Sequence, residues 1–498
     1  MPAGMASKLN ILHQSPYDFL VAPEPLKPSE KHQERWVPSR YNIRATTTDG
    51  RLVLWNSYKG TMCLFEAAQK SAIETLLSQR GFVAEMEGVV KYLADRGFLV
   101  RESTDEYRRI QLGFGQQHYR TDTLQLILLA SEDCNFRCTY CYEDFARGTM
   151  QPWVRTGIKN LVEKRLSGLR SLSVSWFGGE PLYGFQAIED LAPFFLETAS
   201  QNSLRYSTRM TTNGYLLTPE VADKLISWRI NAFQITIDGA PEDHDRSRPT
   251  RDGGGTFSTI LDNLKSLRSR SDQFIVDIRV NFDKGNHPNL KKFLDILEQE
   301  FRGDFRFKIR FRAVGQWGGA NDEKLEVCGR DEALEVQSQM KAEARKRGLN
   351  LSDDIREVQG IGAQVCYAAR PYNFIVGASG KLMKCTVDLD KEDRNVVGQL
   401  GEDGRLDIDQ DKFALWTEPA FERDKKCQKC VVLPACQGVF CPQIRFDTGK
   451  SPCTPLRRNA KRELIETAEG SVKELRKVAI RNGVIDRKVL NVPRLGSE

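Results

Sequence analysis

The sequence predicts an α/β protein built around a partial (β/α)6 barrel, with a small N-terminal domain before it and a cysteine-rich domain after it. Between residues 122 and 320, six short apolar runs alternate with five segments of helical apolar spacing. Alternating strands and helices form parallel sheets, and six such units give an open barrel rather than the closed eight-unit one. Downstream, seven of the twelve cysteines fall between residues 361 and 455.

Length and charge limit the number of domains and the kinds of partner that we expect for this protein. The chain has 498 residues, which suggests about three domains. Its 73 basic and 67 acidic residues leave a net charge of +6, too mild to indicate a nucleic-acid partner. The N-terminus has no apolar segment typical of a signal peptide, and no stretch approaches the roughly 18 apolar residues of a membrane span. We therefore expect a cytoplasmic protein without nucleic-acid or membrane partners.

Shifts in composition divide the chain into segments. Residues 1–39 are polar and rich in proline, which predicts an extended arm. Residues 40–105 combine strand patterns at 41–44, 51–55 and 98–100 with helical patterns at 62–77 and 83–93. The remaining segments are a polar linker over 103–121, the barrel over 120–320, a charged helical bridge over 321–360, the cysteine-rich domain over 361–455, and a C-terminal helix and tail over 456–498.

The predicted barrel strands end just before loops that carry cysteine, glycine, asparagine or aspartate. Such barrels place their chemistry at the C-terminal ends of the strands, so these loops are the expected site. The predicted strands are 124–129, 172–176, 209–212, 233–237, 274–280 and 307–311, and the predicted helices are 153–165, 185–199, 218–228, 256–268 and 288–300.

Three cysteines follow the first barrel strand, in the segment Cys134-Asn-Phe-Arg-Cys138-Thr-Tyr140-Cys141. Their thiolates can converge on one face of a loop. Three cysteines cannot complete a four-ligand iron–sulfur site, so one iron stays open to an outside molecule. The alternative, a structural zinc site, usually has four protein ligands.

This spacing, with the aromatic Tyr140 before the last cysteine, resembles the signature of the radical S-adenosylmethionine (SAM) superfamily. The resemblance implies that Cys134, Cys138 and Cys141 hold a [4Fe-4S] cluster and that SAM binds beside it. An electron donor such as flavodoxin or ferredoxin then starts the reaction. SAM breaks into methionine and a 5′-deoxyadenosyl radical, which removes a hydrogen atom from the substrate.

Two further motifs resemble the SAM-binding segments of that superfamily. Gly178-Gly179-Glu180, after the second strand, resembles the loop that contacts the SAM amino group. Glycines allow close approach of the backbone to a ligand, and a carboxylate matches an ammonium group. Thr236, with Asp238 and His244 behind it, resembles the segment that offers a hydroxyl group near the SAM carboxylate.

An arginine is also expected near that carboxylate. We assign it to Arg248, with Arg246 and Arg251 as alternatives. Asn213, at the end of the third strand, is expected to line the same cavity, the alternative being an ordinary turn asparagine. No general base is recognisable, and Glu143, Asp144 and Asp283 near the rim are expected to be surface carboxylates.

The C-terminal cysteines resemble the SPASM domain pattern at all seven positions, although four residues rather than three separate Cys436 from Cys441. The resemblance implies two auxiliary [4Fe-4S] clusters, with zinc as the alternative metal. Cys328 is a candidate for the fourth ligand of the first cluster, and Cys63 is expected to be a core residue. The first ligand set is Cys366, Cys385 and Cys441, and the second is Cys427, Cys430, Cys436 and Cys453.

The order of strands and helices over 40–105 is winged-helix-like and resembles the RiPP recognition element. That domain binds leader peptides of ribosomally made, post-translationally modified peptides. It pairs an extended leader with a sheet edge beside a helix. We expect residues 51–55 to be that edge and residues 83–95 to be that helix; the alternative is a packing domain without a peptide.

Together these resemblances imply an oxidoreductase that matures a ribosomal precursor peptide by forming a cross-link, either a thioether or a carbon–carbon bond. Three alternatives stay open. The enzyme oxidises a single residue of a protein, as sulfatase-maturing relatives do, or it excises peptide backbone. The third alternative is that the chain is not an enzyme but a zinc-binding protein without catalytic activity.

Overall fold

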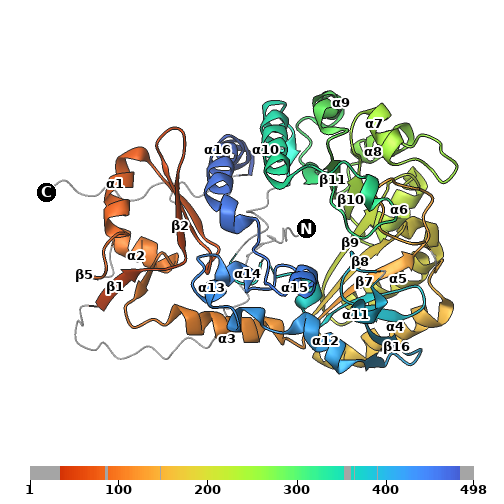
Figure 1. The fold of residues 1–498 in the computed structure, drawn as a ribbon, viewed down its shortest axis with the longest axis horizontal. Coiled ribbons are helices and arrows are strands. Elements are labelled where there is room, and N and C mark those ends of the chain that lie inside the picture. Colours follow the sequence, from red (N-terminus) through yellow and green to blue (C-terminus); the bar gives the residue numbers. More distant parts are fainter. Residues whose placement is uncertain are drawn as a thin grey trace, which may run out of the picture.

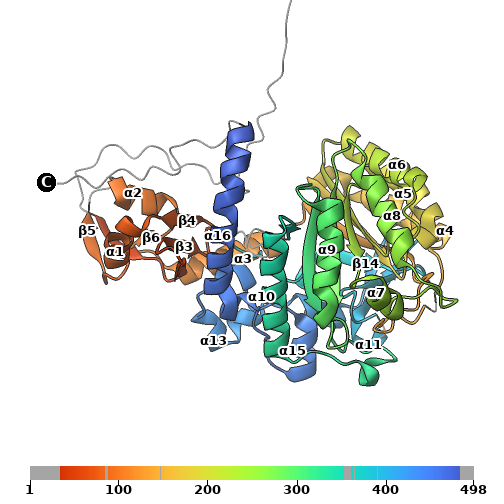
Figure 2. The same ribbon diagram turned by 90° about the horizontal axis from the view of Figure 1, so that it is seen from above.

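Figure 1 shows the computed structural model, which describes residues 34–84, 88–145, 147–352, 360–363, 365–389 and 391–482. The arm predicted over 1–39 and the tail after residue 482 lie almost wholly outside these residues. The N-terminal domain and the barrel occupy opposite ends of the molecule, and helix α16 (Leu456–Asn482) lies between them in both views (Figure 2). No helix in the described ranges combines the length and apolar character needed to cross a membrane.

Six parallel strands in sequence order form the barrel, as predicted. Helices follow the strands on the outside, and α7 (Pro241–Ser247) is an addition that the sequence did not suggest. The strands are β7 (Thr123–Ser131), β8 (Ser171–Gly178), β9 (Arg205–Thr212), β10 (Ala232–Thr236), β11 (Ile275–Phe282) and β12 (Phe307–Ala313). The helices are α4 (Pro152–Arg165), α5 (Phe185–Gln201), α6 (Pro219–Ser227), α8 (Phe257–Arg268) and α9 (Leu290–Phe301).

The barrel sheet extends into the flanking segments on both sides. The two-residue strand β13 (Asn350–Leu351) pairs in parallel with β12, and α10 (Arg330–Lys346) packs beside it. On the other side β14 (Asn373–Val376) pairs in parallel with β7, so the cysteine-rich segment begins as part of the barrel sheet. The rest of that segment consists of β15 (Lys381–Met383), β16 (Val396–Leu400), β17 (Leu406–Ile408), α11 (Glu392–Asn395), α12 (Gln410–Thr417), α13 (Lys425–Gln428), α14 (Leu433–Cys436) and α15 (Pro442–Thr448).

The N-terminal domain contains two three-stranded antiparallel sheets. One has the order β2 (Asn42–Thr46), β3 (Leu52–Asn56), β4 (Met62–Phe65), and the other has the order β5 (Phe82–Ala84), β1 (Glu34–Pro38), β6 (Leu99–Arg101). Two helices, α1 (Ala67–Leu76) and α2 (Gly88–Asp95), pack against them.

Three expectations for this part of the chain were wrong. Residues 51–55, expected at the edge, form the central strand β3, because β2 and β4 pair on its two sides. The helices predicted over 62–77 and 83–95 each begin as a strand, β4 and β5, since short apolar runs suit either period. The polar linker over 103–121 contains α3 (Glu106–His118), which the Asp105 side chain caps and which buries Ile110 and Phe114.

Helix α16 joins the N-terminal domain to the barrel. The face of β2 and β3 that carries Val53 and Trp55 packs against α16 residues that include Leu456 and Leu464. The opposite face packs against α1 and α2. Helix α16 also pairs with α10, through Lys341–Glu463 at 3.4 Å and Arg345–Glu466 at 3.3 Å.

Candidate functional site

The loop that carries Cys134, Cys138 and Cys141 follows β7 at the C-terminal end of the barrel sheet. Backbone hydrogen bonds fasten it to the last residue of α7 and to the segment that follows, so the positions of the three cysteines depend on tertiary contacts rather than on the loop alone. These bonds run from Arg137 N to Pro249 O (2.9 Å), from Thr139 N to Ser247 O (2.9 Å) and from Arg251 N to Asn135 O (2.8 Å).

The surroundings of the three sulfurs suit a metal cluster. Burial raises the pKa of the Cys134 and Cys141 thiols to about 12, so a nearby cation is needed to hold them as thiolates at neutral pH. Two donors point at Cys134 Sγ: Phe136 N at 3.3 Å and Asn213 Nδ2 at 3.8 Å. Hydrogen bonds to cluster sulfurs stabilise their negative charge and tune the reduction potential.

Asn213 makes the turn contact considered for it, and its predicted place in the SAM cavity stays a prediction. Its Oδ1 accepts from Tyr215 N at 3.0 Å, which is the turn contact. Its Nδ2 also donates to Asn135 Oδ1 at 2.8 Å in the cysteine loop. The side chain is buried, so it joins the end of β9 to that loop.

Tyr140 is the centre of a buried polar network. Its hydroxyl donates to the Asp238 carboxylate and accepts from Arg248 Nη1 at 2.7 Å and from Asn281 Nδ2 at 3.0 Å. Burial raises the pKa of Tyr140 well above its usual value, which keeps the phenol protonated as a donor. The network ties the cysteine loop to the ends of β10 and β11.

The three candidate arginines differ in how they are used. Arg246 pairs with Asp243 at 2.6 Å and Arg251 pairs with Asp133, and both arginines are largely exposed. Arg248 is 7% exposed, and its buried Nε has no hydrogen-bond partner among the described residues. Of the three, Arg248 is therefore the one with a spare buried donor, as a carboxylate ligand requires.

The loop Gly178–Glu180 has a structural role that the sequence analysis did not foresee. A Cβ on Gly178 would lie 2.0 Å from Ser131 O, and one on Gly179 would lie 2.6 Å from Asp133 O. Contact within the protein is therefore enough to require glycine at both positions, and the predicted close approach of a ligand stays a prediction.

The Glu180 carboxylate is fully buried and already accepts three hydrogen bonds. The donors are Leu182 N at 2.9 Å, Thr212 Oγ1 at 2.7 Å and Asn213 N at 2.7 Å. Burial raises the pKa of Glu180 to about 7, although these hydrogen bonds oppose the rise. The residue thus ties the ends of β8 and β9 together.

A buried relay supports the loop that carries Arg248. Asp238 N donates to His244 Nδ1 at 3.2 Å, so the imidazole proton lies on Nε2, which contacts Thr256 Oγ1 at 3.0 Å. The Thr256 hydroxyl in turn donates to Arg248 O at 2.8 Å. Thr236, the predicted hydroxyl residue, is buried at the end of β10.

Sequence reasoning gave no role to Asn281 and Asn286. Asn281 binds Tyr140, and Asn286 Nδ2 donates to Asp238 O at 2.7 Å and to Asn281 O at 3.0 Å. The available signal was the position of Asn281 directly after a predicted strand. Glu143 is half-buried rather than a surface carboxylate, and burial raises its pKa to about 8.

The seven C-terminal cysteines fall into two groups whose members affect one another's ionisation. Cys366, Cys385 and Cys441 form one group. Cys427, Cys430, Cys436 and Cys453 form the other. This grouping supports the two ligand sets expected from the sequence.

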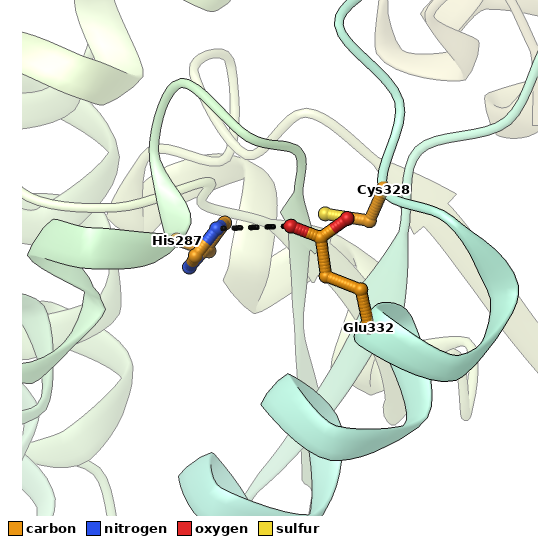
Figure 3. A group of neighbouring side chains, drawn as sticks. All are labelled: His287, Cys328 and Glu332. Atoms are coloured by element: carbon orange, nitrogen blue, oxygen red, sulfur yellow. Dashed lines mark ion pairs between the residues drawn. The ribbon is translucent and has the colours of Figure 1, made fainter.

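The spacing of the cysteines bears on the zinc alternative. Thiolates around a single zinc ion, each about 2.3 Å from the metal, lie about 3.8 Å apart. Among the described residues, one group of three metal-ligating side chains has all its ligand atoms within 4.8 Å of one another. It consists of His287, Cys328 and Glu332 (Figure 3). Zinc therefore stays an alternative for the other cysteines. Cys328, considered as a fourth auxiliary ligand, lies with His287 and Glu332 instead.

Comparisons with known proteins agree with the barrel and its cysteine loop. Residues 128–297 match the family model described as the Radical SAM superfamily. The fold is similar to that of native anSMEcpe with bound AdoMet and Cp18Cys peptide, with a TM-score of 0.52 and 20% identity over 72% of this chain and 99% of that one.

Two curated proteins are similar in sequence over part of their length. The radical SAM cyclopropyl synthase TigE of Paramaledivibacter caminithermalis is 22% identical over 264 residues, which cover 47% of this chain and 54% of TigE. The cysteine-type anaerobic sulfatase-maturating enzyme of Clostridium novyi is 28% identical over 190 residues, which cover 36% of this chain and 49% of that enzyme. The chain thus spans about half the length of these curated relatives.

Proposed function

We propose that the radical SAM domain of this chain is the catalytic part of a peptide maturase, which uses SAM and a [4Fe-4S] cluster to cross-link a ribosomally made precursor peptide. One observation carries the proposal: three thiols, of Cys134 (buried), Cys138 and Cys141 (both partly buried), lie on a fastened loop at the C-terminal end of the barrel, beside the spare buried donor of Arg248.

The residues present fit both groups. Cys134, Cys138 and Cys141 would hold the cluster, and Arg248 with Thr236 would bind the SAM carboxylate, with the Gly178–Glu180 loop near its amino group. When bound, the cluster and SAM supply the radical that removes a hydrogen atom from the substrate.

The protein's own contribution is positioning and exclusion of water. Tyr140 fixes the Arg248 guanidinium, since its hydroxyl accepts from Nη1 and donates to Asp238. Phe136 N and Asn213 Nδ2 stabilise charge on the Cys134 sulfur. Burial of these groups excludes the water that would otherwise quench reactive species.

The N-terminal domain is proposed to capture the leader of the peptide as a RiPP recognition element does. Strand β4 pairs with β3 on one side, and within the described part of the chain its other edge has no partner strand. An extended peptide can add a strand there. Tyr92 OH lies 3.5 Å from Cys63 Sγ, so α2 runs beside β4 and can contact side chains of the peptide.

The C-terminal cysteines are proposed to hold two auxiliary clusters. The Cys366 group offers three thiols, which leaves one iron for an outside ligand and favours a thioether product through a cysteine of the substrate. The Cys427 group offers four and is proposed to exchange electrons with a flavodoxin- or ferredoxin-like donor.

A second candidate is oxidation of a single protein residue. The identity with the C. novyi sulfatase-maturating enzyme favours it. The separate N-terminal sheet with an open edge favours the peptide cross-linking function, because a leader-binding surface is needed only when the substrate carries a leader.

Mass spectrometry tests the proposal directly. Anaerobically reconstituted protein, SAM and a reductant are incubated with precursor peptides encoded beside the gene. We expect a loss of about two mass units, because one new bond replaces two hydrogen atoms. The change should disappear in Cys134→Ala and persist in the control Arg246→Ala, whose side chain is exposed and paired with Asp243. If 5′-deoxyadenosine forms and no peptide changes, the peptide function is wrong; if SAM is never consumed, the radical function is wrong as well.

A further inference from the structure

We propose that His287, Cys328 and Glu332 form a zinc site at the rim of the barrel, separate from the cysteine clusters. Figure 3 shows the thiol of Cys328 and the carboxylate of Glu332 directed toward each other beside the His287 ring. Their ligand atoms all lie within 4.8 Å of one another, and His287 Nε2 is 3.7 Å from Glu332 Oε1. Nitrogen and oxygen ligands about 2.0–2.2 Å from a tetrahedral zinc ion are about 3.4 Å apart, so the group needs only a small adjustment.

The ligand chemistry selects zinc over the common hard cations. Thiolate and imidazole suit zinc and related transition metals, whereas magnesium and calcium take oxygen ligands. Three protein ligands leave a fourth tetrahedral position for water. Binding displaces the Cys328 thiol proton into solvent, so affinity should rise with pH.

The histidine lies on a rigid support. Asp283 Oδ1 accepts from Gly285 N at 2.8 Å and from Asn286 N at 3.0 Å, which fixes the loop immediately before His287. Asn286 is buried and bonded to Asp238 O. The proposed ligand is therefore anchored to the same strand ends that hold Tyr140.

The other two ligands come from the start of α10. Glu332 Oε2 accepts from Gly329 N at 3.0 Å, which orients the carboxylate and leaves Oε1 facing His287. Capping of the helix accounts for one oxygen of Glu332 but not for the thiol and imidazole beside the other. The His287 and Glu332 side chains are 27% and 40% exposed, so an ion can reach the site after folding.

The site lies beside the last strands of the barrel sheet. Beyond β12 the sheet continues only with the two-residue strand β13 among the described residues. A metal ion that joins the loop after β11 to the start of α10 would clamp this side of the barrel. A backbone hydrogen bond already joins these loops, from Lys284 N to Glu326 O at 3.0 Å.

Measurements that are specific to zinc test this site on the full-length holoprotein, because iron in the clusters does not disturb them. Protein is purified anaerobically from zinc-supplemented cells, zinc and iron are counted by mass spectrometry, and the zinc K-edge X-ray absorption is recorded. We expect about one zinc per chain with one sulfur near 2.3 Å and nitrogen or oxygen near 2.0–2.2 Å. Cys328→Ser and His287→Gln should each lower zinc at least about ten-fold with iron unchanged. Glu335→Gln, nearby on α10, is the matched control and should keep zinc.

Several outcomes would overturn the site. Zinc in fewer than about a tenth of the chains at saturating supply would do so, as would zinc undiminished in both variants. A shell of three or four sulfurs would place the zinc among the clustered cysteines instead. If a variant misfolds and loses iron, the zinc K-edge spectrum of the unaltered protein still decides whether the site exists.

Discussion

Two cysteine regions of this molecule offer the same ligand atoms in opposite settings. The loop 134–141 is pinned by backbone bonds to the segment after α7, and Cys134 is buried. The group from Cys427 to Cys453 is built on the short helices α13 and α14, and Cys453 is exposed with Arg457 Nη1 2.9 Å from its sulfur. The lysines next to Cys427 and Cys430 in the sequence, at 425, 426 and 429, are exposed. Burial suits chemistry that must exclude water, and an exposed basic rim suits contact with an acidic electron donor.

The largest expected effect is on SAM cleavage, which should depend far more on the first cysteine region than on the second. Cys134→Ala should lower reductive SAM cleavage by about a thousand-fold or more, because it removes a ligand of the cluster proposed to activate SAM. Cys453→Ser should lose iron from its own cluster but keep most SAM cleavage when a small chemical reductant replaces the protein donor. Liquid chromatography of 5′-deoxyadenosine measures both. Equal losses in the two variants would contradict the division of roles.

The next effect concerns SAM affinity. Arg248→Ala should weaken SAM binding by about 10- to 100-fold, since it removes a buried charge-assisted donor. Arg246→Ala is the control, because Arg246 is exposed and already paired with Asp243. Calorimetry on anaerobic protein measures both. Equal affinities for the Arg248 and Arg246 variants would remove Arg248 from the SAM site.

A pH effect should distinguish the C-terminal region from the barrel. Burial lowers the pKa of His118, at the end of α3, to about 4, and its Nε2 bonds to Thr417 O on α12 at 2.8 Å. Between about pH 6.5 and 4, the His118 side chain is therefore protonated in the unfolded state but neutral in the folded state. The free energy of unfolding falls as the pH falls through this window. The full effect is about 3 kcal/mol.

The measurement is the thermal midpoint of the protein at pH 7 and at pH 5, compared with that of His118→Gln. The variant should be less stable at pH 7 and should lose less stability on acidification. A variant with the same dependence on pH as the unaltered protein would show that other groups are responsible.

The smallest expected effect is a redox shift confined to the exposed group. Arg457→Ala removes a positive donor from Cys453 Sγ, which should make the potential of the cluster proposed there more negative by tens of millivolts. The cluster at 134–141 should not shift. Redox titration followed by electron paramagnetic resonance reports both. A shift of the buried cluster would show that the two regions are coupled.

The sequence predicted features that depend on neighbouring residues and missed features that depend on contacts between distant parts of the chain. The six barrel strands were predicted because each is a single apolar run, and the cysteine loop because its spacing is local. Helix α3 was missed because its buried residues, Ile110 and Phe114, stand among polar neighbours. The centrality of β3 depends on pairing with β2 and β4, which no local pattern encodes.

The site shows the same limit. Tyr140 and Asn281 are 141 residues apart in sequence, yet their side chains are 3.0 Å apart. The glycines at 178 and 179 were singled out for the approach of a ligand, and only the fold reveals that the carbonyl groups of Ser131 and Asp133 also lie behind them. The meeting of His287 with Cys328 likewise depends on two loops that follow different strands.

The position of α16 bears on how this chain is synthesised. Val53 and Trp55 are 0% and 1% exposed, and the residues that cover their face of the sheet include Leu456 and Leu464. About 400 residues must leave the ribosome between the two, which takes on the order of 20–80 s. Throughout that interval the first domain presents an apolar sheet with no covering helix, so a chaperone that shields it should raise the yield of folded chain. A fragment cut after residue 105 would expose the same face permanently.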